Sequence, residues 1–314
     1  MANRRRFLLG LSGLFAAGAT TKVLAETRRN VSKPTGQFIE VDGIKLHYRI
    51  LGETGPKVVI VHGASGNLLD WTIGPALEIA KTNRILIFDR PGLGFSERAT
   101  SDGSNLHVQA ELIRKAAATL GWENTILIGH SYGGSVSLAW ALDAPDTLSG
   151  LMLLAAPSHV WPTPPSTRNR IAANSVTGPV LANLAAAFVP NSMIEGSVET
   201  VFAPQSSPPD YANRMSAALS LKPAVFQANA SDIVALKSHI RQMEAQYERL
   251  QMPLEILHGT ADTIVLPDLH SAQLAKRLPH ANLQMLEGIG HMPHHSATDA
   301  MLAALHRLNT QTGA

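Results

Sequence analysis

A serine lies at an abrupt junction between two kinds of segment in this chain. The apolar run Thr125–Ile128 is typical of a buried strand, and the small-residue segment Gly134–Leu142 is typical of a helix. Between them stands Gly129-His130-Ser131-Tyr132-Gly133. A serine at such a sharp strand-to-helix turn exposes its hydroxyl above the sheet, and the flanking glycines leave the room that the turn needs. This nucleophile elbow predicts nucleophilic chemistry at Ser131.

Short apolar runs recur along the chain, separated by helical patterns. The first two form an expected hairpin around Asp42-Gly43, a strong turn dipeptide. The later runs are continuous in Val, Ile and Leu, as in strands that are buried on both faces of a sheet. The expected strands are 38–41, 45–50, 57–61, 84–88, 125–128, 151–154, 254–257 and 283–286. The predicted fold class is therefore α/β, with a mostly parallel sheet flanked by helices.

The interval between Pro157 and about residue 250 has no strand signal. It contains proline-rich turns and helical patterns, the clearest being formed by Leu236, Ile240, Met243, Tyr247 and Leu250. We expect residues 158–250 to form a helical cap inserted after the sixth strand, over the carboxyl ends of the sheet, where ligands bind in open α/β folds. The core domain would then comprise residues 37–157 and 251–314.

Composition excludes several classes of function. The 314 residues include 45% hydrophobic and 16% charged residues, enough to bury a large core. The chain has no cysteine, which excludes disulfides, zinc-thiolate sites and a thiol nucleophile. Its net charge is only +2, and four of the basic residues lie among the first 25, so nucleic-acid binding has no electrostatic support.

The N-terminus resembles a twin-arginine export signal. Arg4-Arg5-Arg6 precedes a modest apolar stretch, and Val23-Leu24-Ala25 supplies small residues for cleavage. The apolar stretch is interrupted by glycines and is shorter than the roughly 20 residues that a membrane span needs. We expect residues 1–25 to direct the protein to the export machinery and then to the periplasm or the medium. An uncleaved membrane anchor is the alternative.

A serine hydroxyl becomes a good nucleophile only when a base removes its proton and a third group orients that base. His291 is the expected base, because it follows Gly288-Ile289-Gly290 directly after the last expected strand. His294 and His295 compete for this role, but Pro293 is expected to direct them elsewhere.

Asp262 is the expected acid, because it follows the seventh expected strand and completes the order nucleophile, acid, base. Asp268 is the alternative. The oxyanion of a tetrahedral intermediate needs two donors, usually backbone amides. Tyr132 supplies one by its position after Ser131, and Ala64 in the glycine-rich turn 62–66 is the expected second.

Five segments together resemble the α/β-hydrolase superfamily over residues 37–310. They are His62-Gly63, Asp89–Ser96, the elbow, Gly259–Asp262 and Gly290-His291. The resemblance implies that Asp89–Ser96 is mainly a structural loop and that the helical insertion is a lid. Relatives often carry glutamate where this chain has Ser296, which affects none of the expected roles. Dehalogenases and epoxide hydrolases of this superfamily use an aspartate nucleophile, so Ser131 argues against both.

The resemblance implies a serine hydrolase that acts on carboxylic esters, and the apolar composition of the cap suggests a small-molecule substrate with an apolar group. Aromatic residues of the cap, Phe188, Phe202, Tyr211 and Phe226, are candidates for its pocket or its core. A carbon-carbon hydrolase of vinylogous diketo acids is the alternative, with Arg168, Arg170 and Arg214 as candidate carboxylate partners. A receptor with little turnover is a third hypothesis.

No cofactor or metal ion is expected. Gly92-Leu93-Gly94 lacks the third glycine of a dinucleotide fingerprint, and there is no Walker loop. Residues 291–295 contain three histidines, but Pro293 disturbs helical ligand spacing and no carboxylate accompanies them in the sequence. The oligomeric state is not predicted.

Overall fold

An eight-stranded sheet runs through the part of the chain that the structure describes. The computed structural model describes residues 33–99 and 102–312. The spatial order is β1-β2-β4-β3-β5-β6-β7-β8, in which β2 is antiparallel to β1 and β4 and all other neighbours are parallel. The strands are β1 (Gln37–Val41), β2 (Ile44–Leu51), β3 (Lys57–Val61), β4 (Arg84–Phe88), β5 (Thr125–His130), β6 (Leu148–Leu154), β7 (Leu254–Gly259) and β8 (Asn282–Leu286). The predicted mostly parallel α/β sheet is confirmed.

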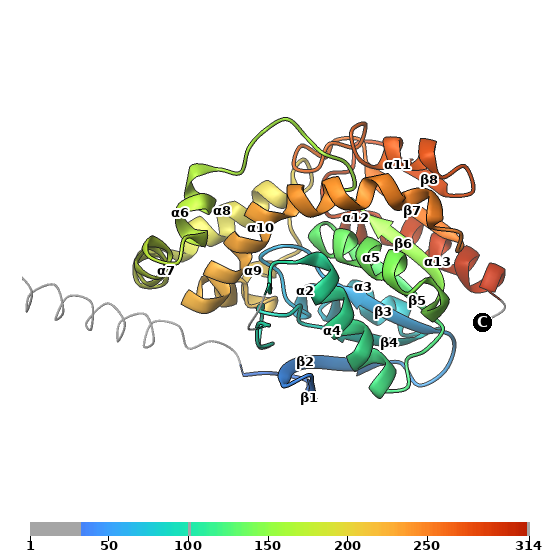
Figure 1. The fold of residues 1–314 in the computed structure, drawn as a ribbon, viewed down its shortest axis with the longest axis horizontal. Coiled ribbons are helices and arrows are strands. Elements are labelled where there is room, and N and C mark those ends of the chain that lie inside the picture. The colour runs from blue at the N-terminus through green and yellow to red at the C-terminus, as the bar shows by residue number, and fades with distance from the viewer. Residues whose placement is uncertain (1–32, 100–101, 313–314) are drawn as a thin grey trace, which may run out of the picture.

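Successive residues of the central strands point into two separate hydrophobic cores, as the period of a strand requires. Val59 and Val61 belong to one core, whereas Val58 and Ile60 belong to the other. The first face is covered by α4 (Leu106–Thr119), α5 (Tyr132–Asp143) and α11 (Ser271–Arg277). The second is covered by α2 (Leu69–Thr72), α3 (Pro75–Ile79) and α13 (Thr298–Thr312) (Figure 1). Burial on both faces explains the continuous apolar runs in the sequence.

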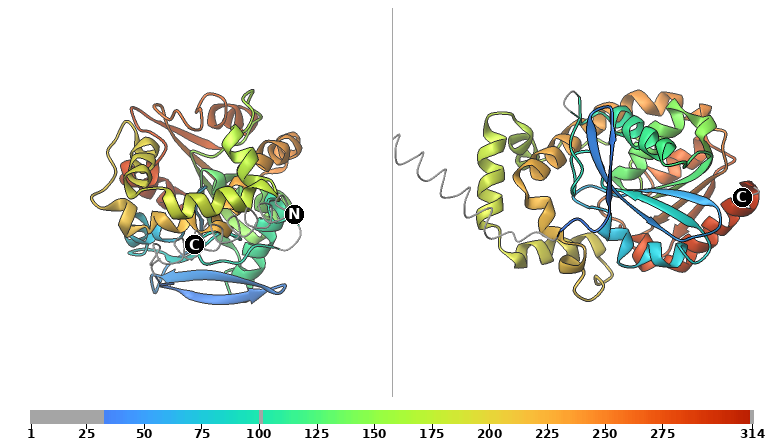
Figure 2. Two further views of the ribbon diagram at one scale, coloured as in Figure 1. Left: turned by 90° about the vertical axis from the view of Figure 1, so that its left-hand side faces the viewer. Right: turned by 90° about the horizontal axis from the view of Figure 1, so that it is seen from below.

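The helices between β6 and β7 lie mostly on the left in Figure 1 and on the left of the right-hand view in Figure 2. We call residues 167–249 the insertion. It consists of α6 (Thr167–Ala173), α7 (Thr177–Phe188), α8 (Asn191–Phe202), α9 (Tyr211–Arg214), the 3-10 helix η2 (Ala217–Leu221), α10 (Pro223–Met243) and the 3-10 helix η3 (Glu244–Arg249). The remaining short helices are η1 (Pro145–Thr147) and α12 (Pro293–Ser296).

The aromatic residues of the insertion lie in different environments. Phe202 and Tyr211 are buried together, with ring centroids 4.9 Å apart, and Phe226 is half-buried. Phe188, the last residue of α7, is 59% exposed. Phe188 is therefore not part of the hydrophobic core. Helical spacing of four places it in an outward-facing apolar row with Val176, Val180 and Leu184.

The expected export segment, residues 1–25, lies outside the described residues. Across residues 33–99 and 102–312, no single helix is both long and apolar enough to cross a bilayer. Helices α6 and α7 reach that length and composition only when they are taken as a pair, and they are bent by 109°.

Three buried histidines are expected to make the folded state sensitive to mild acid. Burial lowers the pKa of His62, His270 and His294 from 6.5 to about 4. At pH values between these limits the unfolded chain binds more protons than the folded one, so the free energy of unfolding falls as the pH falls. We expect calorimetry to give a lower Tm at about pH 5 than at about pH 7. Both pH values lie above the range in which carboxylates ordinarily titrate, so the change is assigned to the histidines. A constant Tm over that interval would contradict this prediction.

Candidate active site

The turn between β5 and α5 holds Ser131 in a backbone conformation that residues with a side chain rarely adopt. Its φ is 51° and its ψ is −125°. The Ser131 amide nevertheless donates to the carbonyl of Leu154 on β6 at 2.9 Å, and its carbonyl accepts from the Gly134 amide at 2.8 Å. The chain therefore reverses direction within one residue, at the carboxyl end of β5.

Close packing fixes three glycines around this turn. A Cβ atom on Gly133 would lie 2.2 Å from the carbonyl oxygen of Val61 on the neighbouring strand β3. A Cβ on Gly129 or on Gly134 would each lie 2.4 Å from its nearest neighbour, a side-chain atom of Ser137 or Ala156. Since the helix can approach the sheet this closely only without these side chains, the glycines determine where Ser131 stands.

The structure brings the three expected residues of the triad together. The Oγ atom of Ser131 lies 2.9 Å from Nε2 of His291, and Nδ1 of His291 lies 2.6 Å from Oδ2 of Asp262. All three residues are buried, with exposed fractions of 8%, 5% and 3% for serine, histidine and aspartate. An ionised carboxylate can only accept, so Nδ1 of His291 carries a proton and Nε2 is free to accept from Ser131.

Asp262 is held by more groups than the sequence predicts. Its Oδ1 accepts from the amides of Ile264 and Val265, at 2.8 and 3.0 Å. Its Oδ2 lies 3.0 Å from Nε2 of His258, at the end of β7. Burial acts to raise the pKa of Asp262, but the hydrogen bonds from His258 and His291 outweigh it and hold the pKa well below its usual range.

His258 is the first residue that sequence reasoning missed, and its only signal was the spacing of four to Asp262. The alternative acid, Asp268, is exposed. The imidazole of His291 is instead hydrogen-bonded to Asp262. Asp262 therefore has the geometry expected of the acid.

The turn after β3 approaches Ser131 on the side where the oxyanion donors are expected. A Cβ on Gly63 would lie 3.2 Å from Cβ of Ser131, so Ala64 follows a point of close approach. Tyr132 is the first residue of α5, and the first amides of a helix have no acceptor within that helix. His62, at the start of this turn, accepts from the Arg90 amide at 2.9 Å.

His294 and His295 bind a carboxylate that is remote in the sequence. Their Nε2 atoms lie 3.2 and 2.8 Å from the nearest oxygens of Asp70 on α2. A carboxylate therefore accompanies these histidines in space although none does in the sequence, because the fold places α2 beside α12. The ligand atoms of the three residues lie within 4.8 Å of one another, a set that could hold a metal ion. Both imidazoles are already hydrogen-bonded to Asp70, and Tyr211 donates a further bond to the same carboxylate.

A second buried histidine links the elbow to the expected base. His130 precedes Ser131, and its Nε2 donates to the backbone carbonyl of His291 at 2.9 Å. Its ring packs against His294 with centroids 4.3 Å apart. His130 therefore fixes the backbone of His291, whereas Asp262 fixes its ring.

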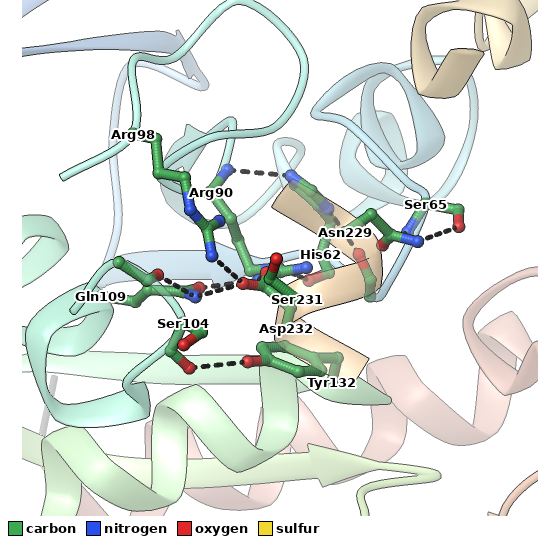
Figure 3. A network of polar contacts seen from close by, with 12 residues as sticks. His62, Ser65, Arg90, Arg98, Ser104, Gln109, Tyr132, Asn229, Ser231 and Asp232 are labelled. Atoms are coloured by element: carbon green, nitrogen blue, oxygen red, sulfur yellow. Dashed lines mark hydrogen bonds and ion pairs between the residues drawn. The ribbon is translucent and has the colours of Figure 1, made fainter. Parts of the chain in front are cut away.

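A buried ionic network connects the insertion to the core beside Tyr132 (Figure 3). Nη1 of Arg90 donates to Oδ2 of Asp232 on α10 at 3.0 Å, and both side chains are fully buried. The guanidinium lies 4.2 Å from the centroid of the Tyr132 ring. Arg98 donates to the other oxygen of Asp232 at 2.9 Å. Loss of Asp232 would leave a buried guanidinium without its counterion.

The arginines that the sequence indicated as substrate partners do not take part in this network. Arg168, Arg170 and Arg214 are exposed. Arg214 donates to the backbone carbonyl of Ile73 at 2.7 Å, and Arg170 to Thr167 in its own helix at 3.3 Å. Their positions give no support to a carboxylate site.

Comparison with known proteins supports the fold. The profile of a family described as alpha/beta hydrolase fold matches residues 56–298. An uncharacterized protein of Mycobacterium tuberculosis is 28% identical over 274 residues, which are 85% of this chain and 79% of that protein.

Two further similarities are to proteins whose names state an activity. A 2-hydroxy-6-oxononadienedioate/2-hydroxy-6-oxononatrienedioate hydrolase of Paraburkholderia phymatum is 27% identical over 152 residues, 45% of this chain and 53% of that protein. The solved structure of a thermophilic esterase from Thermogutta terrifontis has a TM-score of 0.67 at 21% identity, covering 87% of this chain and 100% of that one.

The packing of the elbow predicts that two glycine-to-alanine substitutions change the free energy of unfolding by very different amounts. Gly133→Ala should lower the free energy of unfolding by about 1–3 kcal/mol, because the new Cβ would meet backbone atoms of β3 that cannot move independently. Gly196→Ala, on α8, is the matched control, since a Cβ there has no neighbour within 4 Å. That change should stabilise slightly or have no effect. Equal Tm values for the two variants would contradict the close packing.

Proposed function

This chain belongs to the α/β-hydrolase fold family, and from that premise we propose that it hydrolyses carboxylic esters through an acyl-enzyme on Ser131. The observation that carries the proposal is the continuous chain of hydrogen bonds from Ser131 through His291 to Asp262. A buried serine, a neutral acceptor nitrogen and an oriented carboxylate are the parts that acyl transfer to a hydroxyl requires.

In the proposed first step, Oγ of Ser131 attacks the ester carbonyl while its proton moves to Nε2 of His291. The developing oxyanion accepts hydrogen bonds from the amides of Ala64 and Tyr132. When the tetrahedral intermediate collapses, the carbon-oxygen bond to the alcohol breaks and His291 returns the proton to the leaving oxygen. In the second step His291 removes a proton from water, which attacks the acyl group and releases the acid and the free serine.

Asp262 is proposed to remain ionised throughout. Its lowered pKa supports this role, because the carboxylate keeps its negative charge beside the imidazolium that forms during each step. The second imidazole partner, His258, would hold the carboxylate in place while the charge on His291 changes.

Cleavage of a carbon-carbon bond is the second candidate. It is favoured by the similarity to the Paraburkholderia phymatum hydrolase, although only over 45% of this chain. The substrates proposed for such a reaction carry carboxylates, and the exposed insertion arginines do not support that substrate class. Ester hydrolysis is therefore the first proposal. Export to the periplasm or the medium through residues 1–25 also stays a prediction.

A panel of p-nitrophenyl esters of increasing chain length, with a vinylogous diketo acid included, tests the reaction. We expect turnover of the esters, and we expect Ser131→Ala to reduce it by several orders of magnitude with little change in Tm, because Ser131 supplies the attacking oxygen. A variant that keeps even about a tenth of the activity, roughly 1.4 kcal/mol of barrier, would exclude Ser131 as the nucleophile. Turnover of the diketo acid alone would favour the carbon-carbon hydrolase. No turnover of any substrate would favour a receptor.

The acid is tested by comparing two aspartates. Asp262→Asn should keep the shape of the site but lower turnover by roughly 10⁴-fold, because the amide no longer selects the tautomer of His291 that can accept from Ser131. Asp268→Asn is the matched control, because that side chain is exposed. It should be close to wild type in kcat. If the two variants ranked the other way, the acid role would pass to Asp268.

A further inference from the structure

The insertion does more than lie over the core, because its side chains hold both loops that flank Ser131. One loop, residues 288–291, carries His291. The other, residues 63–66, carries Ala64. Each is contacted through two hydrogen bonds by one carboxamide of the insertion: Gln205 on the first loop and Asn229 on the second.

Gln205 contacts the peptide groups that lead into His291. Its Nε2 donates to the carbonyl of Gly288 at 2.8 Å, and its Oε1 accepts from the amide of Gly290 at 2.9 Å. Gly290 is also pressed against the insertion, since a Cβ there would lie 2.0 Å from the carbonyl oxygen of Ala203. The segment Gly288-Ile289-Gly290 has wide backbone freedom by its composition, and Gln205 removes part of it.

Besides the hydrogen bond between Ser131 and His291, three hydrogen bonds hold His291 and the amide that precedes it. Asp262 holds its ring and His130 holds its carbonyl, at 2.6 and 2.9 Å. Both of these partners belong to the core. The bond from the preceding amide to Gln205 is the one that comes from the insertion.

Asn229 holds the other loop at a strained residue (Figure 3). Ser65 has a φ of 55°, in the left-handed region. Its amide donates to Oδ1 of Asn229 at 2.7 Å, and Nδ2 of Asn229 donates to its Oγ at 2.9 Å. Ser65 directly follows Ala64, so these bonds fix the peptide unit next to the expected oxyanion donor.

We propose that Gln205 and Asn229 are positioning residues for acyl transfer, through which the insertion holds His291 and the Ala64 amide in their reacting geometry. This inference rests on the proposed function. It differs from a lid that only covers the site and selects substrates, because loss of either carboxamide should slow the chemical step itself. Misplacement of a reacting group by about 1 Å can cost on the order of 10²-fold in rate.

The test is the acylation rate, measured as the burst of p-nitrophenol from p-nitrophenyl acetate in full-length protein. Gln205→Met and Asn229→Leu keep the approximate size of each side chain but remove its hydrogen bonds. Each should lower acylation by roughly 10- to 100-fold with little change in KM. Glu248→Gln is the matched control, because it breaks an insertion-to-core ion pair with Arg277, at 3.2 Å, that touches neither loop. It should keep the wild-type acylation rate.

A conservative variant distinguishes a hydrogen bond that positions the loop from general attachment of the insertion to the core. Gln205→Glu keeps an acceptor for the Gly290 amide, so its acylation rate should lie well above that of Gln205→Met even if both have the same Tm. If Gln205→Met fails to fold, the comparison of Gln205→Glu and Asn229→Leu with Glu248→Gln decides. Folded variants with wild-type acylation rates would overturn the inference. A wild-type protein that neither hydrolyses esters nor reacts with a fluorophosphonate at Ser131 would instead overturn the proposed function.

Discussion

The left-handed backbone of Ser131 is the constraint on which the rest of the site depends. A residue with a side chain rarely adopts a φ of 51° with a ψ of −125°, and surrounding structure has to hold it there. Here Gly133 is packed against the carbonyl of Val61, and the Ser131 amide continues the pairing of β5 with β6. The sheet thus maintains the strained backbone of Ser131. Its Oγ atom is held in one place, and the other groups of the site are arranged around it.

Around this atom, charge is distributed between a few buried carboxylates that each bind several partners. Asp262 accepts from two backbone amides and two imidazoles, and Asp70 accepts from two imidazoles and the hydroxyl of Tyr211. A buried carboxylate with several donors stays ionised, and the pKa of both groups is held below the usual range. The Asp262 and Asp70 clusters also join segments from distant parts of the chain, so these buried charges have their partners only in the folded state.

The sheet and the elbow could be predicted because their signals are local. Apolar runs and glycines reveal strand ends, and the carboxyl ends of parallel strands meet at one edge, so Ser131, Asp262 and His291 could be selected before any geometry was known. The partners that hold them could not. Asp70 and Gln205 meet the histidine loop only because α2 and the insertion are folded against it, and neither has a motif of its own. The exposure of Phe188 could not be predicted either, since helical periodicity does not say which side of α7 is covered.

The placement of the insertion in the chain has a consequence for the order in which the protein folds. Strand β6 ends at Leu154, and its parallel partner β7 begins at Leu254. Pairing them requires closure of a loop of about 100 residues, and such non-local parallel pairing is slow compared with the formation of helices and short-range contacts. The nucleophile precedes this gap and the acid and base follow it. A nascent or partly folded chain would therefore present its serine long before it could activate it, and hydrolytic competence would be acquired in the last stage of folding.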